Sequence, residues 1–362
     1  MTNEEDYCLE MIKVNRPVRV MHTETPVREI WSMLSFFESE HNAETYLKQK
    51  FGELQGLSEL RTSLAYTIRT AGEYYTAAEN VTDLTSPLLL FYGMTNLAKV
   101  LFMATHGKLS PSRSHGLLIV DESSPFQDQS VRVTQDGTFP QFHGCISKQS
   151  LEGLIFSLQE LLSLIPEIKV NFETVYNQKS NAIKVQRRKH GISLVDSEFQ
   201  KYGDLNIISK IPEIQKRYAE PQFVRDHAFL MTVNSDVQDS TTNALSGEEY
   251  LVLPLTRGKD LLILPEMSVH FLIMFILGIL SRYTSRQWLD LQIGSKTGEI
   301  YIVQKFLEVT TRKFPNLILN ELHDRQFVFT SPRTETGDLT EDQLDEIYDH
   351  ISRRMMRDLS GY

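Results

Sequence analysis

The stretch that organises this chain is SPLLLFYGMTNLAKVLFMATHG, residues 86–107. Ser86 suits the N-cap of a helix and Pro87 its first turn, while Gly107 suits the position after the last turn. Apolar residues recur at helical spacing and cover most of the circumference, for example at Leu90, Met94, Leu97 and Leu101. We therefore predict one long, largely buried helix.

One polar stripe interrupts this apolar surface. Tyr92, Asn96 and Lys99 are spaced so that they share one face of the helix. Burying such groups without hydrogen-bonding partners would cost a few kcal/mol each. The stripe is therefore expected to face water, a polar network in the core, or a ligand.

Composition narrows the class of protein. A chain of 362 residues predicts two domains, or one domain with a large insertion. The formal net charge of −10 argues against a general nucleic-acid binder but leaves room for a local basic patch. Two cysteines, Cys8 and Cys145, provide neither a disulfide framework nor a metal cluster, so we expect a reducing, cytoplasmic setting and no cofactor or metal. The N-terminus does not resemble a signal peptide, and the apolar run 271–280 is too short to cross a membrane.

The expected fold class is α+β, predominantly α, with a helical core, a β-hairpin insertion and a second β-rich segment. We predict six segments: an N-terminal segment with the first part of the helical core (1–116), the β-insertion (117–149), a helix with a basic irregular segment (150–218), the β-rich segment (219–264), the second part of the helical core (265–333) and an acidic C-terminal helix (334–362).

Several local expectations underlie this division. Asp136-Gly137 predicts a hairpin turn, with strand-like residues after it up to Cys145. Ser150 is expected to cap a helix over 151–165. Pro315 is expected to interrupt the helix that begins near Gly298.

Three stretches together resemble the YaaC-like family of bacterial proteins. They are Pro87–Gly107 with the following His115-Gly116-Leu117, the segment 151–168, and the segment 271–288 with Ser281-Arg282-Tyr283 and Trp288. The biochemical role of that family is not established, so the resemblance implies a relative without implying a reaction.

A fainter resemblance concerns HEPN domains. The segment 91–99, its small-residue helix end and the later His-Gly resemble the helix-pair pattern of these α-helical, often dimeric domains of toxins, RNases and phage-defence proteins. HEPN nucleases carry an Arg and a His separated by four to six residues on a helix. The one such spacing here runs from Arg16 to His22 and contains Pro17 in an extended segment. The nuclease motif is therefore expected to be absent.

Three clusters are candidate sites. His106 and His115, with Lys99 and Arg113, could hold a phosphate or RNA or supply a general base, so Lys99, His106 and His115 are the catalytic candidates; the alternative is a helix end and a loop contact. A second cluster could bind a phosphate and stack a base, or could pair with the acidic tail: Arg282, Tyr283, Arg286 and Trp288. A third is a basic patch that could contact nucleic acid or an acidic partner, or could be a solvated face: Lys184, Arg187, Arg188 and Lys189. The candidate ligand-binding set consists of Tyr92, Asn96, Lys99, Arg113, Arg282, Tyr283, Arg286 and Trp288.

No nucleotide-binding, hydrolase or metalloprotease motif occurs in the sequence. We therefore expect a non-catalytic binding or regulatory protein, as a homo-oligomer or with a protein partner, in bacterial stress or phage defence. The alternative is a HEPN-related, metal-independent RNase or nucleotide-processing enzyme, with RNA or a nucleotide as ligand. That alternative requires the first two clusters to converge on one cleft.

Overall fold

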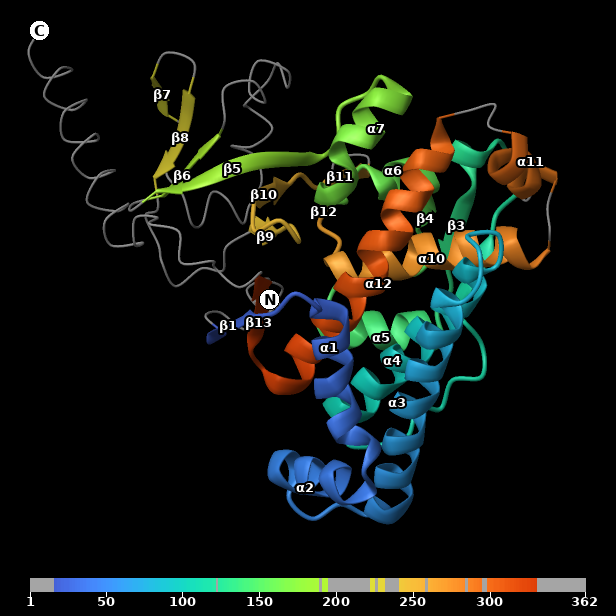
Figure 1. Ribbon diagram of the computed structural model, residues 1–362, viewed down its shortest axis with the longest axis vertical. Coiled ribbons are helices and arrows are strands. Elements are labelled where there is room, and N and C mark those ends of the chain that lie inside the picture. The colour runs from blue at the N-terminus through green and yellow to red at the C-terminus, as the bar shows by residue number, and fades with distance from the viewer. Residues whose placement is uncertain are drawn as a thin grey trace, which may run out of the picture.

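A computed structural model describes residues 16–121, 123–188, 191–194, 222–224, 227–231, 241–257, 260–283, 286–294 and 298–330. These residues form a mainly helical body with small sheets, which confirms the predicted α+β, predominantly α class (Figure 1). The helices are α1 (Pro26–Ser35), α2 (Glu40–Phe51), α3 (Leu57–Glu79), α4 (Ser86–His106), α5 (Thr138–Ile146), α6 (Leu158–Leu162), α7 (Lys169–Tyr176), α10 (Glu266–Arg282), α11 (Arg286–Gly294) and α12 (Glu299–His323).

The strands belong to four sheets. They are β1 (Val18–His22), β2 (Leu117–Ile119), β3 (Ser130–Val133), β4 (Ile155–Ser157), β5 (Ala182–Arg188), β6 (Gly191–Leu194), β7 (Gln222–Val224), β8 (His227–Met231), β9 (Thr241–Asn243), β10 (Glu249–Val252), β11 (Leu255–Arg257), β12 (Asp260–Leu262) and β13 (Gln326–Thr330). Residues 1–15, which include Cys8, and the predicted acidic helix 334–362 lie outside the described residues.

Helix α4 forms where the sequence predicted it. Gly107 follows it in the left-handed conformation (φ 63°), and its amide donates a hydrogen bond to the Met103 carbonyl. Thr85, not Ser86, is the N-cap residue, so Pro87 lies one position later than predicted but still in the first turn, where its missing N–H is not needed. Most of α4 is buried, as its wide apolar surface requires.

Helices α3 and α10 pack directly on α4 (Figure 1). A Cβ atom added at Gly93 would lie 2.6 Å from the Tyr75 ring of α3, and one added at Gly278 of α10 would lie 3.2 Å from Phe91. Glycine at these two positions therefore lets both neighbours approach α4 closely, and α4 becomes the centre of the helical core.

Two local expectations for residues 117–165 were wrong. The segment around Phe142 and Cys145 is helix α5, and residues 155–157 of the expected long helix form strand β4. Phe139, Phe142, His143 and Ile146 have helical spacing and are all buried, so this face of α5 packs into the core. Strand β4 exists because it pairs with β3, which lies between β2 and β4 in an antiparallel sheet.

Two boundary expectations were also wrong. Gly137 is the residue before α5 and does not close a hairpin. Pro315 lies inside α12, which continues to His323 although proline removes one helical hydrogen bond. Residues on both sides of it, such as Phe314 and Ile318, are fully buried, so tertiary packing offsets the local cost.

The larger sheet has the strand order β7-β8-β6-β5-β10-β9 and is antiparallel throughout. Its strands come from the predicted β-rich segment and also from residues 182–194, which were expected to be irregular. A separate apolar cluster fills one side of it, including Ile183, Ile192 and Leu251. The sheet therefore has its own small core beside the helical one, while the exact limits of the six predicted segments stay a prediction.

A two-stranded parallel sheet joins the two ends of the described chain. Strand β1 pairs with β13, with Val18 opposite Gln326.

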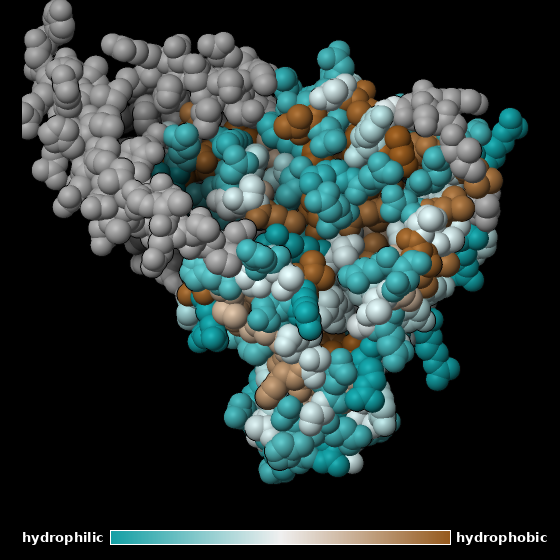
Figure 2. Space-filling view, viewed as in Figure 1, coloured by the Kyte–Doolittle hydropathy of each residue, from teal (hydrophilic) through white to brown (hydrophobic). Residues whose placement is uncertain are grey.

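Figure 2 shows hydrophilic residues over α2 at the lower end of the molecule and more hydrophobic ones in the upper part, around α7 and α11. Val170 on α7 is the most exposed large apolar residue in the described chain.

Candidate functional site

Three basic side chains of the first two predicted clusters converge: Lys99, His115 and Arg282. Lys99 lies in the second half of α4, His115 precedes β2, and Arg282 ends α10. The charges of Lys99 and Arg282 both act on the His115 imidazole, which places all three in one neighbourhood. We call these residues the cation cluster.

The backbone around His115 is held against the start of α5. The Phe139 amide donates to the His115 carbonyl over 2.9 Å, and the Thr138 amide donates to the Ser114 carbonyl over 2.9 Å. Gly116 has a φ of 76°, and an added Cβ would lie 2.4 Å from Pro140. Only glycine fits there, so the His-Gly pair that the sequence singled out has a structural reason.

The His115 ring lies between the two central helices. Its centroid is 5.1 Å from that of Phe91 on α4 and 6.0 Å from that of Phe275 on α10. Burial lowers the pKa of His115, and the positive charges of Lys99 and Arg282 lower it further. At neutral pH the imidazole is therefore uncharged, with one nitrogen as donor and one as acceptor.

The cations of this cluster have no anionic partner in the part of the chain that the structure describes. Lys99 is half-buried and Arg282 is exposed, and neither forms an ion pair or a side-chain hydrogen bond with a described residue. The Arg282 guanidinium lies 5.3 Å from the ring centre of the exposed Tyr283. Arg113, near His115 in sequence, is exposed and also unpaired among the described residues. Positive charge without a counter-ion beside an aromatic ring suits an anionic ligand.

His106 lies in a separate environment. Its ring stacks on Phe102 at 4.4 Å, its Nδ1 is 3.2 Å from the Phe102 carbonyl, and the Cys145 Sγ is 3.9 Å from that nitrogen. Burial raises the pKa of the Cys145 thiol to about 12, so this cysteine is not a reactive thiolate. These contacts are those of a helix end packed on α5.

The remaining residues of the ligand-binding set have structural partners. Asn96 donates to the Tyr92 carbonyl over 2.9 Å, and Tyr92 packs on Tyr74 of α3. Trp288 is fully buried and its Nε1 donates to the Leu84 carbonyl over 2.9 Å. Helix α10 ends at Arg282, so Arg286 does not share a helix with it; Arg286 is almost fully exposed, 3.8 Å from Asp290.

The two basic-patch side chains that the structure describes are paired with carboxylates of the neighbouring strand region. Lys184 on β5 forms an ion pair with Glu248, and Arg187 forms one with Glu249. The Arg188 side chain and Lys189 lie outside the described residues. Antiparallel pairing of β5 with β10 brings these opposite charges together, which sequence spacing alone did not indicate.

Sequence reasoning missed a buried ionic network where the helical core meets the larger sheet. The Lys313 Nζ lies 2.6 Å from carboxylate oxygens of both Glu167 and Glu266 and 2.9 Å from the Asn243 carbonyl. Burial would lower the pKa of Lys313, but Glu266 and Glu167 outweigh it and hold the pKa above the usual value. A lysine on the same helical face as Val309 and Thr310 was the one available signal.

Among the described residues, no three His, Cys, Asp or Glu side chains gather as a metal site would require. Helix α4 is long and apolar enough to cross a membrane, but most of it is buried inside the protein, as in the core helix of a soluble protein.

Comparison with known proteins gives one family. No curated protein and no solved structure matches this chain, so the HEPN resemblance stays a prediction. The family model described as YaaC-like Protein matches residues 35–322, which include α2 to α7 and α10 to most of α12, together with every residue of the cation cluster. The chain therefore belongs to the YaaC-like family.

Proposed function

We propose that this YaaC-like protein binds a phosphate-bearing anion, a nucleotide or an RNA segment, at the cation cluster. The observation that supports it is that the charges of Lys99 and Arg282 both act on the half-buried His115 and that neither cation has an anionic partner among the described residues. Lysine and arginine together supply eight N–H donors, and Tyr283 beside Arg282 offers a surface on which a base stacks.

The proposed role is binding or regulation and not catalysis. Of the two histidines among the catalytic candidates, His106 is engaged with Phe102 and Cys145, so His115 and His106 do not form an acid–base pair. The first two predicted clusters therefore converge only in part. Arg282 lies near Lys99 and His115, while His106 and Arg286 do not belong to the cation cluster.

The HEPN-related nuclease is the alternative. Its Arg–His pair has no support from the geometry, because Arg16 forms a bidentate ion pair with Glu321 at 2.6 Å and His22 lies on strand β1 near Thr330. The proposal also includes a regulatory role in bacterial stress or phage defence, as a homo-oligomer or with a protein partner. This part of it rests on the HEPN analogy alone.

The first test is purification from a native host, followed by the size-exclusion mass and identification of co-purifying nucleotide, RNA and protein. Binding of pyrophosphate, ADP and a short single-stranded RNA is then measured by calorimetry. Lys99→Ala and Arg282→Ala should each weaken binding by about 10- to 100-fold, the range for losing a charged hydrogen bond.

Arg132→Ala is the matched control, because it removes one positive charge at an exposed position of β3 outside the cluster. If none of the three probes binds, or if the control weakens binding as much as Arg282→Ala, the proposed site is wrong. Cleavage of the RNA would favour the nuclease alternative.

A further inference from the structure

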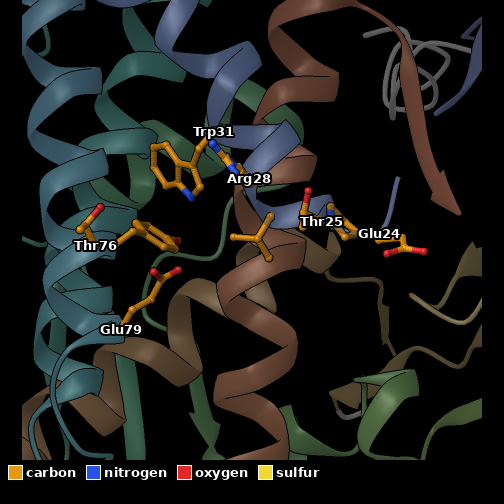
Figure 3. Close-up of a pocket in the computed structure, with 9 residues that line it drawn as sticks. Glu24, Thr25, Arg28, Trp31, Thr76 and Glu79 are labelled. Atoms are coloured by element: carbon orange, nitrogen blue, oxygen red, sulfur yellow. The ribbon is translucent and has the colours of Figure 1, made fainter. Parts of the chain in front are cut away.

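A cavity of about 550 Å³ lies away from the cation cluster, between the turn that follows β1, the start of α1 and the C-terminal half of α3. Its polar and aromatic lining residues include Glu24, Arg28, Trp31, Tyr75, Thr76 and Glu79. Figure 3 shows Trp31, Thr76 and Glu79 gathered on one side of the cavity and Thr25 and Glu24 at the other end. No residue of this lining belongs to the predicted clusters.

Two aromatic rings form one wall. The centroids of Trp31 and Tyr75 are 4.9 Å apart, with the planes inclined by 55°. A Cβ added at Gly72 would lie 3.5 Å from the Trp31 ring, so the indole packs closely on α3. The 55° inclination leaves no parallel slot for a flat base, but the ring faces suit a compact cation.

The Tyr75 hydroxyl is a polar group without a partner. Tyr75 is only 2% exposed, and its hydroxyl forms no hydrogen bond with any described residue. A buried hydroxyl without a partner is unfavourable, and such groups in native proteins call for an explanation. The hydroxyl oxygen itself has almost no accessible surface, so it lies behind the cavity wall and out of reach of a ligand.

The charge of the lining is net negative. Glu24 and Glu79 supply two carboxylates and Arg28 one guanidinium, and none of the three has an ion pair within the described residues. Glu79 lies on the aromatic side of the cavity (Figure 3). The aromatic side of the cavity therefore has an available carboxylate, Glu79, and Arg28 also lies on this side, next to Trp31 (Figure 3).

We propose that this cavity binds a small organic cation, with an ammonium or guanidinium group beside Glu79 and its apolar part on Trp31. A cation gains from both the ring faces and the carboxylate, whereas an anion would meet two like charges. This site is independent of the cation cluster, which takes the opposite charge.

Nuclear magnetic resonance of the full chain tests the proposal directly. The sequence has two tryptophans, Trp31 in the cavity wall and the buried Trp288, so the spectrum contains two indole N–H signals that Trp31→Phe assigns. Titration with butylammonium and with butylguanidinium should move the Trp31 signal saturably and leave that of Trp288 in place. Comparing the two probes shows which cation is preferred, and 1-butanol is the neutral control.

Three variants test the proposal. Glu79→Gln should weaken binding of the preferred probe by about fivefold or more, while Glu73→Gln, at an exposed position of the same helix outside the cavity, should leave it unchanged. Tyr75→Phe should leave binding unchanged and raise the melting temperature of the unliganded protein, because it removes a buried hydroxyl that has no partner among the described residues.

The proposal is overturned if neither cation moves the Trp31 signal, if 1-butanol moves it equally, or if Glu73→Gln weakens binding as much as Glu79→Gln. It is equally overturned if Glu79→Gln leaves binding unchanged. Thermal melting of Glu79→Gln separates a folding defect from a loss of the binding group.

Discussion

His143 provides the most quantitative test of the structure. It is buried in α5, and its Nε2 lies 2.9 Å from the Gln149 carbonyl while its Nδ1 lies 2.8 Å from the Ser268 hydroxyl of α10. A carbonyl only accepts, so Nε2 carries the proton and Nδ1 accepts the hydrogen bond that Ser268 donates. The folded protein therefore requires a neutral imidazole, and burial lowers the pKa of His143 to about 4.

The sign and size of the pH effect follow from this pKa. The unfolded chain binds a proton near pH 6.5 and the folded chain only near pH 4, so stability falls as the pH drops from about 6.5 towards 4. The limiting slope is about 1.4 kcal/mol per pH unit. Between pH 7 and pH 5 the loss in the free energy of unfolding amounts to about 2 kcal/mol.

Urea unfolding at pH 7 and pH 5, at constant ionic strength, measures the effect in the wild type and in His143→Gln. The glutamine amide can donate to the Gln149 carbonyl and accept from Ser268, but it does not titrate. The pKa values of His115 and His323 are also lowered, but both residues remain in both proteins and cancel in the comparison.

The wild type should lose about 2 kcal/mol more than His143→Gln between the two pH values. Equal losses in the two proteins would refute the assignment of a neutral, buried His143. A smaller stability of the variant at pH 7 alone would not, because it reports packing and not titration.

Three further outcomes are expected. Gly93→Ala should lower the free energy of unfolding by about 1–3 kcal/mol, because its Cβ would lie 2.6 Å from a buried ring; Gly72→Ala on the neighbouring helix, where the contact is 3.5 Å, should be neutral or stabilising in the same thermal melts. Lys313→Met should cost about 3–5 kcal/mol in urea unfolding, because it removes the buried cation that lies 2.6 Å from both the Glu167 and the Glu266 carboxylates; Lys305→Met, at a more exposed ion pair, should change stability by no more than about 0.5 kcal/mol. The affinity of the cation cluster for an anion, measured by calorimetry, should rise as the pH is lowered from 7.5 to 5.5. The reason is that a bound anion raises the lowered pKa of His115 and so stabilises the protonated imidazole. An affinity that does not change with pH would contradict a role for that side chain.

Local pattern predicted the central helix well. Helix α4 has an apolar repeat long enough to bury most of its circumference, and it lies within one residue of the predicted stretch 86–107. The pattern failed for the short elements. Strand β4 depends on hydrogen bonds to β3, in which Phe156 lies opposite Val131, and no repeat within three residues indicates such a partner.

The candidate sites, too, were predictable from local sequence only in part. The sequence placed Lys99 on a polar stripe and His115 beside a required glycine, but only the packing of α10 on α4 brings Arg282 to them. The pairs Lys184–Glu248 and Arg187–Glu249 likewise depend on a strand register. The cavity beside Trp31 and Tyr75 was not predicted at all, because its residues come from two helices and the turn after β1.

The sequence by itself determined the helical class, the central helix with its glycine end, and the membership of the family. The hydrogen bonds and the apolar period of a helix connect residues that are at most a few positions apart, so a helix can be predicted from the local sequence. Tertiary structure alone decided which described cations lack a partner, which carboxylates pair with Lys184 and Arg187, and where a cavity lies beside Trp31. These properties depend on contacts between distant residues, whose geometry is set by close packing of side chains and not by spacing in the sequence.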